Sequence, residues 1–255
     1  FVAGQLAGLI ERVNSTALIL KQQKDLNSEK EKLKDQRDLA LQYQSMLLSS
    51  QLNPHFIFNS LNSIQYFILD KDPLPALNFL TDFSSLMRSV LNNSAQKYIT
   101  LTEEITFLEM YLNLELKRYS DKFRYEIIIR EDFNTDEILI PPMLLQPFLE
   151  NTVIHGVGNL MKDGLITIEL NLKKGKVEFV ITDNGVGREE AARLKVMRKG
   201  DSSKSWSTDI NSSRLEILNQ LEYNQYSAKV KDRTDQKGKS IGTQVIVTIP
   251  ISLDE

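Results

Sequence analysis

The spacing of apolar residues changes once along this chain of 255 residues, and that change limits the folds it can adopt. Up to about residue 120, apolar residues recur at three- and four-residue steps, as in helices that bury one face. Beyond that point, short runs rich in β-branched and aromatic residues predict strands. The sequence therefore predicts a helical region followed by an α+β domain, with the boundary near Ser120 and Asp121.

Before residue 49, the sequence is polar, highly charged and suited to a long helix. Apolar residues recur every seven positions, at Leu26, Leu33, Ala40 and Leu47 and, before a break in phase, at Leu6, Val13 and Leu20. This partial heptad predicts a two-stranded coiled coil over residues 1–48. A single solvated helix stays open as the alternative, because the second seam position is often polar, as at Glu29 and Gln36.

Residues 49–121 predict a helical hairpin followed by a third helix. An apolar stripe marks the first helix, at Ile57, Leu61, Ile64 and Ile68, and a second stripe follows at Leu77, Leu80, Met87 and Leu91. At 100° per residue, His55 and Asn59 lie opposite the first stripe, so we expect His55 to be exposed. Thr102 is the expected N-cap of the third helix.

Five runs after residue 121 are rich in strand-forming residues: 123–130, 165–172, 177–182, 228–231 and 243–250. Segments 141–155 and 213–221 read as helices between them. Strands of one mixed sheet with interspersed helices predict an α+β domain over residues 122–255.

Bulk properties exclude several classes of protein. The net charge of −3 argues against sequence-independent binding to nucleic acid, which needs a basic surface. The absence of cysteine excludes disulfides and thiolate chemistry, and it fits a reducing cytoplasm. No apolar run reaches the roughly 18 residues that span a bilayer, and no signal peptide is present. Because the sequence begins at Phe1, we expect a longer protein whose membrane or sensor region lies upstream.

The chain has two histidines, and each lies in a segment that suggests phosphate chemistry. His55 follows Asn53 and Pro54 on the exposed face of a helix, where a neutral imidazole is nucleophilic and open to a second protein. His155 lies in segment 150–156, which reads as a nucleotide-binding helix together with Glu150 and Asn151. Carboxylate and amide oxygens side by side suit Mg²⁺.

Asp183 ends a predicted strand and begins an Asp-x-Gly-x-Gly turn with Gly185 and Gly187. A carboxylate there can accept a hydrogen bond from an adenine amino group, and the glycines let the backbone approach a ligand. Gly242 and Thr243, before the last predicted strand, are a weaker candidate for the same site.

Segment 188–213 is rich in Ser, Lys and Gly and contains Trp206, so it reads as a mobile lid or as an ordinary surface loop. Four of its basic side chains are candidates to approach phosphates: Lys195, Arg198, Lys199 and Lys204.

These motifs resemble those of the sensor histidine kinases of the LytS/YehU-like family. Segment 53–62 resembles the family's phosphoacceptor box, and segment 117–123 resembles the end of its helical domain. Segment 145–151 resembles its N box, and segment 183–187 resembles its G1 box. The resemblance covers residues 45–250.

The resemblance implies a dimeric, DHp-like helical hairpin that carries His55, and a Bergerat-type α/β sandwich that binds ATP with Mg²⁺. It implies a cytoplasmic homodimer that phosphorylates His55 and then an aspartate of a response regulator. Asn151 would be the metal ligand, and Asp183 would read adenine. The expected nucleotide site also includes Glu150, His155, Gly185, Gly187, Gly242 and Thr243. Asn59, one turn after His55, is a candidate for dephosphorylating the regulator.

The sequence departs from the family pattern at three points. Phe56 replaces the acid that many histidine kinases place after the histidine, as is usual in this family, so the general base is unidentified. Ile154 stands where a lysine is common. Segment 207–215 aligns with the G2 box but lacks its glycines. More weakly, segment 1–12 resembles the last helix of a GAF sensor domain.

Two alternatives to an active kinase stay open. A degenerate kinase could bind ATP poorly and act as a scaffold for the regulator or as its phosphatase, which the missing G2 glycines favour. An ATPase of topoisomerase or chaperone type is the other alternative. The histidine-bearing helix ahead of the nucleotide motifs argues against that last class.

Overall fold

The computed structural model describes residues 20–32, 34, 54–69, 73–130, 133–199, 214–221 and 225–251. The chain divides into two compact units, Phe1–Ser45 and Met46–Glu255. In the first unit, residues 20–32 and 34 are helical and exposed, which agrees with the predicted helix. Leu33, Ala40 and Leu47 lie outside the described residues, as does segment 1–12, so the coiled coil and the GAF-like helix stay predictions.

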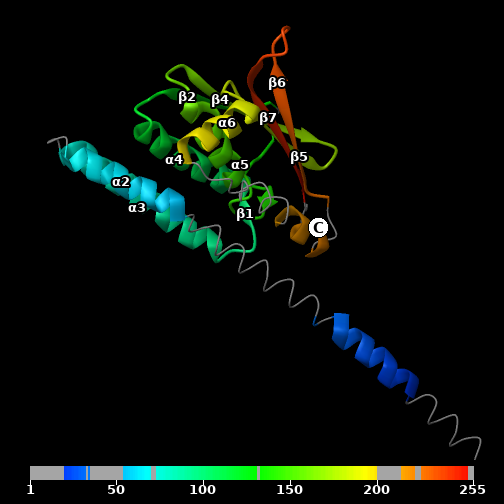
Figure 1. The fold of residues 1–255 in the computed structure, drawn as a ribbon. Helices are drawn as coiled ribbons and strands as arrows, with labels where there is room; N and C mark the ends of the chain where they lie inside the picture. The colour runs from blue at the N-terminus through cyan, green and yellow to red at the C-terminus, as the bar shows by residue number, and fades with distance from the viewer. Residues whose placement is uncertain are drawn as a thin grey trace, which may run out of the picture. The chain divides into compact units, whose positions relative to one another are not determined.

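The second unit begins with a helical hairpin, α2 (Pro54–Leu69) and α3 (Pro73–Ser94), whose helices contact each other (Figure 1). Aromatic rings join the two helices: Phe56 lies 6.1 Å from Phe83, and Phe67 lies 5.6 Å from Phe79 between ring centroids. The buried residues of the hairpin are Phe56, Ser60, Ala76, Phe79, Leu86, Val90 and Asn93.

The apolar stripes predicted for these helices lie largely on the exposed side. Leu61 and Ile68 of α2 are 49% and 61% exposed, and Leu77 and Leu91 of α3 are 60% and 61% exposed. Each helix is apolar on two sides, so its periodicity predicted the helix correctly but not the side that packs within the chain.

A short strand, β1 (Ile99–Thr100), leads into α4 (Leu101–Arg118). The predicted N-cap, Thr102, is wrong: Thr100 caps α4, because its hydroxyl accepts from Glu103 N at 3.1 Å and Glu103 Oε2 accepts from Thr100 N at 2.8 Å. This reciprocal capping box uses the threonine three residues before a glutamate. Thr102 instead shares a hydrogen bond of 2.7 Å with the hydroxyl of Thr135.

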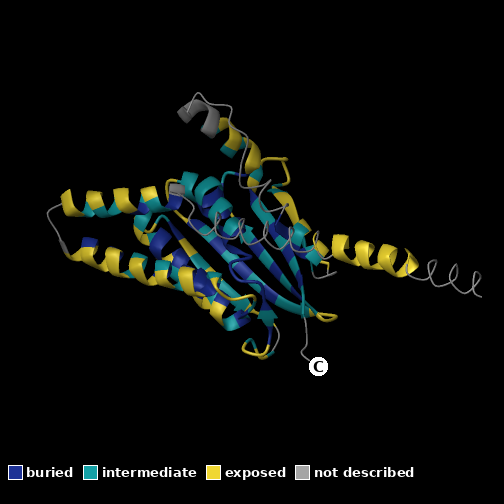
Figure 2. Ribbon diagram, turned by 90° about the horizontal axis from the view of Figure 1, so that it is seen from below, coloured by how far each residue is buried: buried dark blue, intermediate teal, exposed yellow. Residues whose placement is uncertain are grey.

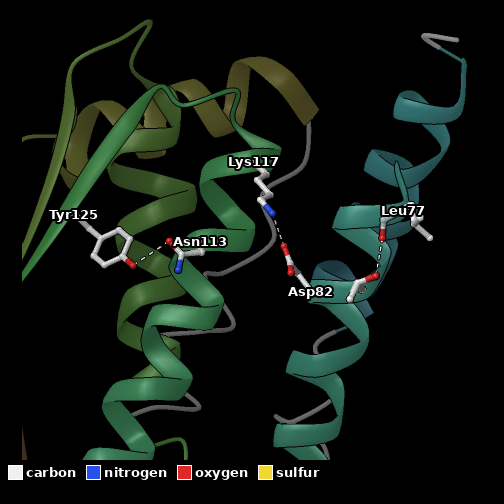
Figure 3. A network of polar contacts seen from close by, with 6 residues as sticks. Leu77, Asp82, Asn113, Lys117 and Tyr125 are labelled. Carbon is white, nitrogen blue, oxygen red and sulfur yellow. Dashed lines mark hydrogen bonds and ion pairs between the residues drawn. The ribbon is translucent and has the colours of Figure 1, made fainter. Parts of the chain in front are cut away.

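Helix α4 contacts both the hairpin and the sheet (Figure 3). Lys117 forms an ion pair with Asp82 of α3, and Asn113 Oδ1 accepts from the hydroxyl of Tyr125 at 3.0 Å. The domain boundary predicted near residue 121 stays a prediction.

Five strands form a mixed sheet: β2 (Phe123–Ile129), β4 (Gly164–Lys173), β5 (Lys176–Asp183), β6 (Ser227–Thr234) and β7 (Ser240–Pro250). Their order is β2-β4-β5-β7-β6, with β2 and β4 parallel and the other neighbours antiparallel. β3 (Leu139–Ile140) pairs with β1 in a separate small sheet. All five predicted strands are present, and the predicted fold class, helices followed by an α+β domain, is confirmed.

The remaining helical elements differ from the prediction. Segment 141–155 is not one helix: α5 (Gln146–Asn151) is followed by a π-helical segment (Thr152–Gly156) and a 3₁₀ turn (Val157–Asn159). The predicted lid is also partly wrong, because α6 (Arg188–Lys199) occupies its first part. Residues 200–213 lie outside the described structure, whereas residues 214–221 are helical as predicted.

The core lies on one face of the sheet, where alternate residues are buried (Figure 2). It includes Ile166, Ile168 and Leu170 of β4, Val177, Phe179 and Ile181 of β5, and Val245, Val247 and Ile249 of β7. The π-helical segment contacts β7 and the 3₁₀ turn contacts β4, so these helical turns are packed on the sheet. No helix within the described ranges has the length and apolar character needed to cross a bilayer.

Candidate nucleotide site

Asp183, the last residue of β5, is the centre of the candidate site. Its side chain is buried, with 2% of the residue exposed. Oδ1 accepts from Gly185 N at 2.7 Å, and Oδ2 accepts from the hydroxyl of Thr243. The structure therefore brings together three residues that the sequence predicted for one site, although Thr243 lies on a different strand. A carboxylate has further lone pairs, so it can still accept from a ligand amino group.

Glycines surround the Asp183 carboxyl and its backbone. A Cβ added to Gly156 would lie 3.1 Å from Asp183 Oδ1, and one added to Gly185 would overlap the backbone of Gly156. Gly242 has a φ of +121°, and a Cβ there would overlap the Asp183 carbonyl. The close approach of three chain segments thus requires glycine at these positions.

Gly187 closes the Asp-x-Gly-x-Gly turn with a φ of +79°, in the left-handed region that favours glycine. A side chain there would overlap Ser240, the first residue of β7. The turn is also tied to β4, because Asn184 Oδ1 accepts from Leu165 N at 2.7 Å and Asn184 Nδ2 donates to Asp163 O at 2.9 Å. This turn is therefore fixed on both sides by neighbouring strands.

The electrostatics of Asp183 fit a carboxyl that is largely removed from water. Burial raises the pKa of Asp183, while hydrogen bonds from Thr243 and Gly185 and the nearby Arg233 charge act in the opposite direction. Arg233 also donates from Nη1 to the Asp183 carbonyl at 2.8 Å. The sequence analysis did not identify Arg233, which lies in strand β6 with no motif around it.

The second part of the site lies on α5 and the π-helical segment. Leu145, Leu149, Thr152 and Val153 are buried, whereas Glu150, Asn151 and His155 are half-buried on the other side, as predicted. Gln146 Nε2 donates to Glu150 Oε1 at 2.8 Å. The wider π turn, in which Val157 N donates to Thr152 O, carries the chain to Gly156 beside Asp183.

The donor set fits a magnesium ion that is shared with nucleotide phosphates. Across the described residues, no group of three or more acidic or histidine side chains could enclose a metal by itself. Mg²⁺ at phosphate-transfer sites is commonly held by one or two protein oxygens together with phosphates and water. Asn151 can supply one such oxygen.

A buried polar cluster on α4 was not anticipated from the sequence. Tyr111 and Glu115 are buried one helical turn apart, and Glu115 forms an ion pair with Arg118. Burial raises the pKa of Glu115 to about 7, against the opposing effect of Arg118 and with a smaller contribution from the Glu150 charge. The cluster therefore interacts electrostatically with the predicted nucleotide-binding helix.

His55 and Asn59 lie on α2 and are not part of the group around Asp183. The side chain of His55 is outside the described structure, and Asn59 is half-buried. The next residue, Phe56, lies 5.7 Å from Tyr111 between ring centroids, so this end of α2 packs on α4. Lys195, Arg198, Lys199 and Lys204 have side chains outside the described structure, as do residues 207–213 of the G2-like segment.

Comparison with known proteins gives this site a family context. Residues 43–123 match the family model described as Histidine kinase. Sensor protein LytS of Staphylococcus epidermidis is 34% identical over 140 residues, which cover 55% of this chain and 23% of that protein. Sensor protein LytS of Staphylococcus haemolyticus is 32% identical over 203 residues, covering 80% of this chain and 33% of that protein.

Two further proteins are similar to this chain. Sensor protein kinase HptS of Staphylococcus aureus is 28% identical over 208 residues, covering 80% of this chain and 38% of that protein. Among solved structures, the catalytic domain of histidine kinase ThkA is similar over 62% of this chain and 97% of its own, with 15% identity and a TM-score of 0.43.

The chain spans between about a quarter and two fifths of the length of these relatives. The family match lies over the histidine-bearing helices, and the relatives extend the similarity to most of the chain. By these matches, residues 43–123 carry the histidine kinase family model, and most of the chain is similar to the LytS sensor proteins.

Proposed function

We propose that this chain is the kinase region of a two-component sensor, which binds ATP with Mg²⁺ and phosphorylates itself on His55. The observation that carries the proposal is the buried Asp183 carboxyl, held by Gly185 and Thr243 and enclosed by glycine backbone. The histidine kinase family match covers the helix that contains His55.

In the proposed reaction, the residues of the chain divide into a binding group and an acceptor. The Asp183 carboxylate accepts a hydrogen bond from the exocyclic amino group of adenine. Asn151 offers its amide oxygen to Mg²⁺, which supplies charge neutralisation to the phosphates when bound. Glu150 and His155 flank Asn151 on the same half-buried side and complete the proposed contact surface.

His55 is the proposed nucleophile. A neutral imidazole nitrogen attacks the γ-phosphorus, the bond to the bridging oxygen breaks, and ADP leaves with that electron pair. An aspartate of a response regulator then attacks the phosphorus. The bond to His55 breaks, which forms an aspartyl phosphate and restores the free imidazole. Asn59, one helical turn after His55, is the proposed residue that assists attack of water on this aspartyl phosphate, which releases inorganic phosphate and the free aspartate.

Exposed apolar residues of the hairpin support a homodimer as the working state. Leu61, Ile68, Leu77 and Leu91 are each about half or more exposed, although they continue the apolar pattern of their helices. Contiguous apolar surface of this kind marks a protein interface. A second copy of the chain that covers this face would form a four-helix arrangement.

One sequence feature favours a second candidate function, a regulator-binding scaffold or phosphatase. The G2-like segment 207–215 contains no glycine. If this weakens ATP binding, the hairpin would still dimerise and bind the regulator without forming phosphohistidine.

The test is incubation of the purified chain with γ-labelled ATP and Mg²⁺, beside His55→Gln, Asn151→Ala and Asp183→Asn. We expect acid-labile, base-stable label on the wild type and none on the three variants. Because His155 is the only other histidine, loss of label in His55→Gln assigns the acceptor. A folded wild type that binds ATP weakly and takes no label would instead favour the scaffold or phosphatase.

A further inference from the structure

The turn that leads into α5 is buried, and several of its backbone polar groups form hydrogen bonds with side chains of the protein. Residues 141–145 connect β3 to α5, and all five are buried. Buried backbone N–H and C=O groups need partners within the protein. Two charged side chains from distant parts of the sequence supply them.

Glu104 of α4 satisfies the N–H groups of this turn. Its carboxylate is fully buried, and it accepts from Met143 N at 2.8 Å and from Leu145 N at 3.1 Å. Burial raises the pKa of Glu104, and these backbone hydrogen bonds and the Arg214 charge oppose that effect. One carboxylate therefore fixes two backbone donors of the turn, one with each of its oxygens.

Arg214 satisfies carbonyl groups of the same turn. It is 2% exposed, donates from Nη1 to Met143 O at 2.7 Å, and also donates to Pro142 O. Arg214 begins the described helix at residues 214–221 and is the next-to-last residue of the G2-like segment. A guanidinium fork suits this bidentate contact, whereas the point charge of a lysine does not.

The conformation of the turn needs this support. Met143 has a φ of +53°, in the left-handed region that non-glycine residues adopt at a cost. Both its N–H and its carbonyl are held, the first by Glu104 and the second by Arg214. Such a residue persists only where its surroundings fix it, and here they do so from two sides.

Helix α5 lacks the local features that usually define where a helix begins. It has only six residues, and no side chain caps its N-terminus at Leu145. A helix this short is not stable by itself. Glu104 holds the N–H of Leu145, so the position of Glu150 and Asn151 depends on the turn that Glu104 and Arg214 fix.

We propose that Glu104 and Arg214 are positioning residues of the nucleotide site, which fix the turn at residues 142–145 and thereby place Asn151 toward Mg²⁺-bound nucleotide. This inference rests on the proposed function, because it assigns a role in the same site. Groups that orient a metal ligand typically change affinity by 10- to 100-fold when removed. The pair also links the end of the G2-like segment to the N-box helix.

The test is calorimetric titration of the whole chain with Mg²⁺ and a nonhydrolysable ATP analogue, for wild type and Glu104→Gln. The glutamine keeps the size of the side chain but loses the charge and one acceptor. We expect the dissociation constant to rise about tenfold or more. In labelling kinetics, KM for ATP should rise more than kcat falls.

Val177→Ala is the matched control for a loss of stability. Val177 is fully buried at the start of β5, six residues from Asp183 and hence about 20 Å along the strand. We expect this variant to lower the melting temperature while leaving the dissociation constant of the analogue unchanged. A merely structural role for Glu104 would give the same result as Val177→Ala.

The outcomes separate this inference from the proposed function. If the wild type binds no analogue, the proposed function fails, and the positioning role fails with it. If the wild type binds and folded Glu104→Gln binds equally well, only the positioning role is overturned. If Glu104→Gln does not fold, Arg214→Lys decides: weaker binding supports the inference, and unchanged binding overturns it.

Discussion

The hairpin and the sheet domain bury their apolar residues to very different extents. Among the described residues, nine large apolar side chains of α2 and α3 are exposed, against four from β2 to the end of β7. The strands of the sheet bury alternate residues on one face, whereas much of each hairpin helix is exposed (Figure 2). The difference supports the proposed dimer, in which a second copy of the hairpin covers these exposed apolar residues.

Two phenylalanines, one from each region, give the sharpest test of this difference. Phe179 is fully buried in β5, whereas Phe58 of α2 is 65% exposed. Phe179→Ala should lower the free energy of unfolding by about 3–5 kcal/mol, through lost burial and the cavity left behind. Urea denaturation of the monomer at low protein concentration is the measurement.

Phe58→Ala is the matched control and should change the unfolding of the monomer by no more than about 0.5 kcal/mol. Equal losses for the two variants would contradict the contrast between the regions.

The buried Glu115 predicts a pH dependence of stability in the body of the protein. Its pKa is raised to about 7 in the folded chain, from 4.5 for an ordinary glutamate. The folded state therefore holds this proton more tightly than the unfolded state, and stability falls as pH rises from about 4.5 to about 7. Over that range the loss should reach about 3 kcal/mol, and Glu115→Gln should not show it.

The measurement is urea denaturation of both proteins at several pH values between 4 and about 8. The difference between their stability curves isolates Glu115 from all other titrating groups. Parallel curves would show that Glu115 keeps an ordinary pKa.

Self-association should depend on the exposed face of the hairpin and not on the exposed residues of the sheet. Leu77→Gln removes an apolar side chain worth about 2 kcal/mol when buried, and a twofold dimer contains it twice. We expect the dimer dissociation constant to rise by more than tenfold, measured by sedimentation equilibrium. Ile129→Gln, which changes a residue 45% exposed on β2, is the control and should leave the dimer intact.

The smallest expected effect concerns the start of α4. Thr100→Ala removes the capping box and should lower the free energy of unfolding by about 1 kcal/mol. Thr106→Ala is a control within the same helix, where the hydroxyl only bonds back to Thr102 O at 2.9 Å. If the two variants lose the same stability, the cap contributes nothing specific.

Much of the fold could be predicted because the sheet strands carry a period of two over several residues. β1 and β3 were missed since two-residue strands carry no period. α6 was missed because its sequence is charged, with few apolar residues to form a stripe. The faces of α2 and α3 could not be assigned, because both sides of each helix are apolar and only packing decides between them.

The residues of the candidate site that could be predicted are those of a local motif, and those that could not are the ones that make long-range contacts. Asp183, Gly185 and Gly187 form a local motif, and their turn is visible in the sequence. Arg233 and the pair Glu104 and Arg214 act on backbone groups that are distant in the chain, and nothing local marks such contacts. Residues of a local motif were therefore predictable, whereas residues that make long-range contacts to backbone were not.

Because Thr152–Gly156 is π-helical, the site depends on the number of residues in this segment as well as on which residues they are. A π turn contains one residue more than an α turn. Deleting a single residue there would let the helix close with ordinary spacing and would turn Glu150 and Asn151 by about 100° relative to Gly156 and Asp183. Single deletions in this segment should therefore abolish nucleotide binding, whereas alanine substitutions at the same positions should only weaken it. Insertions and deletions are thus the changes that this segment tolerates least.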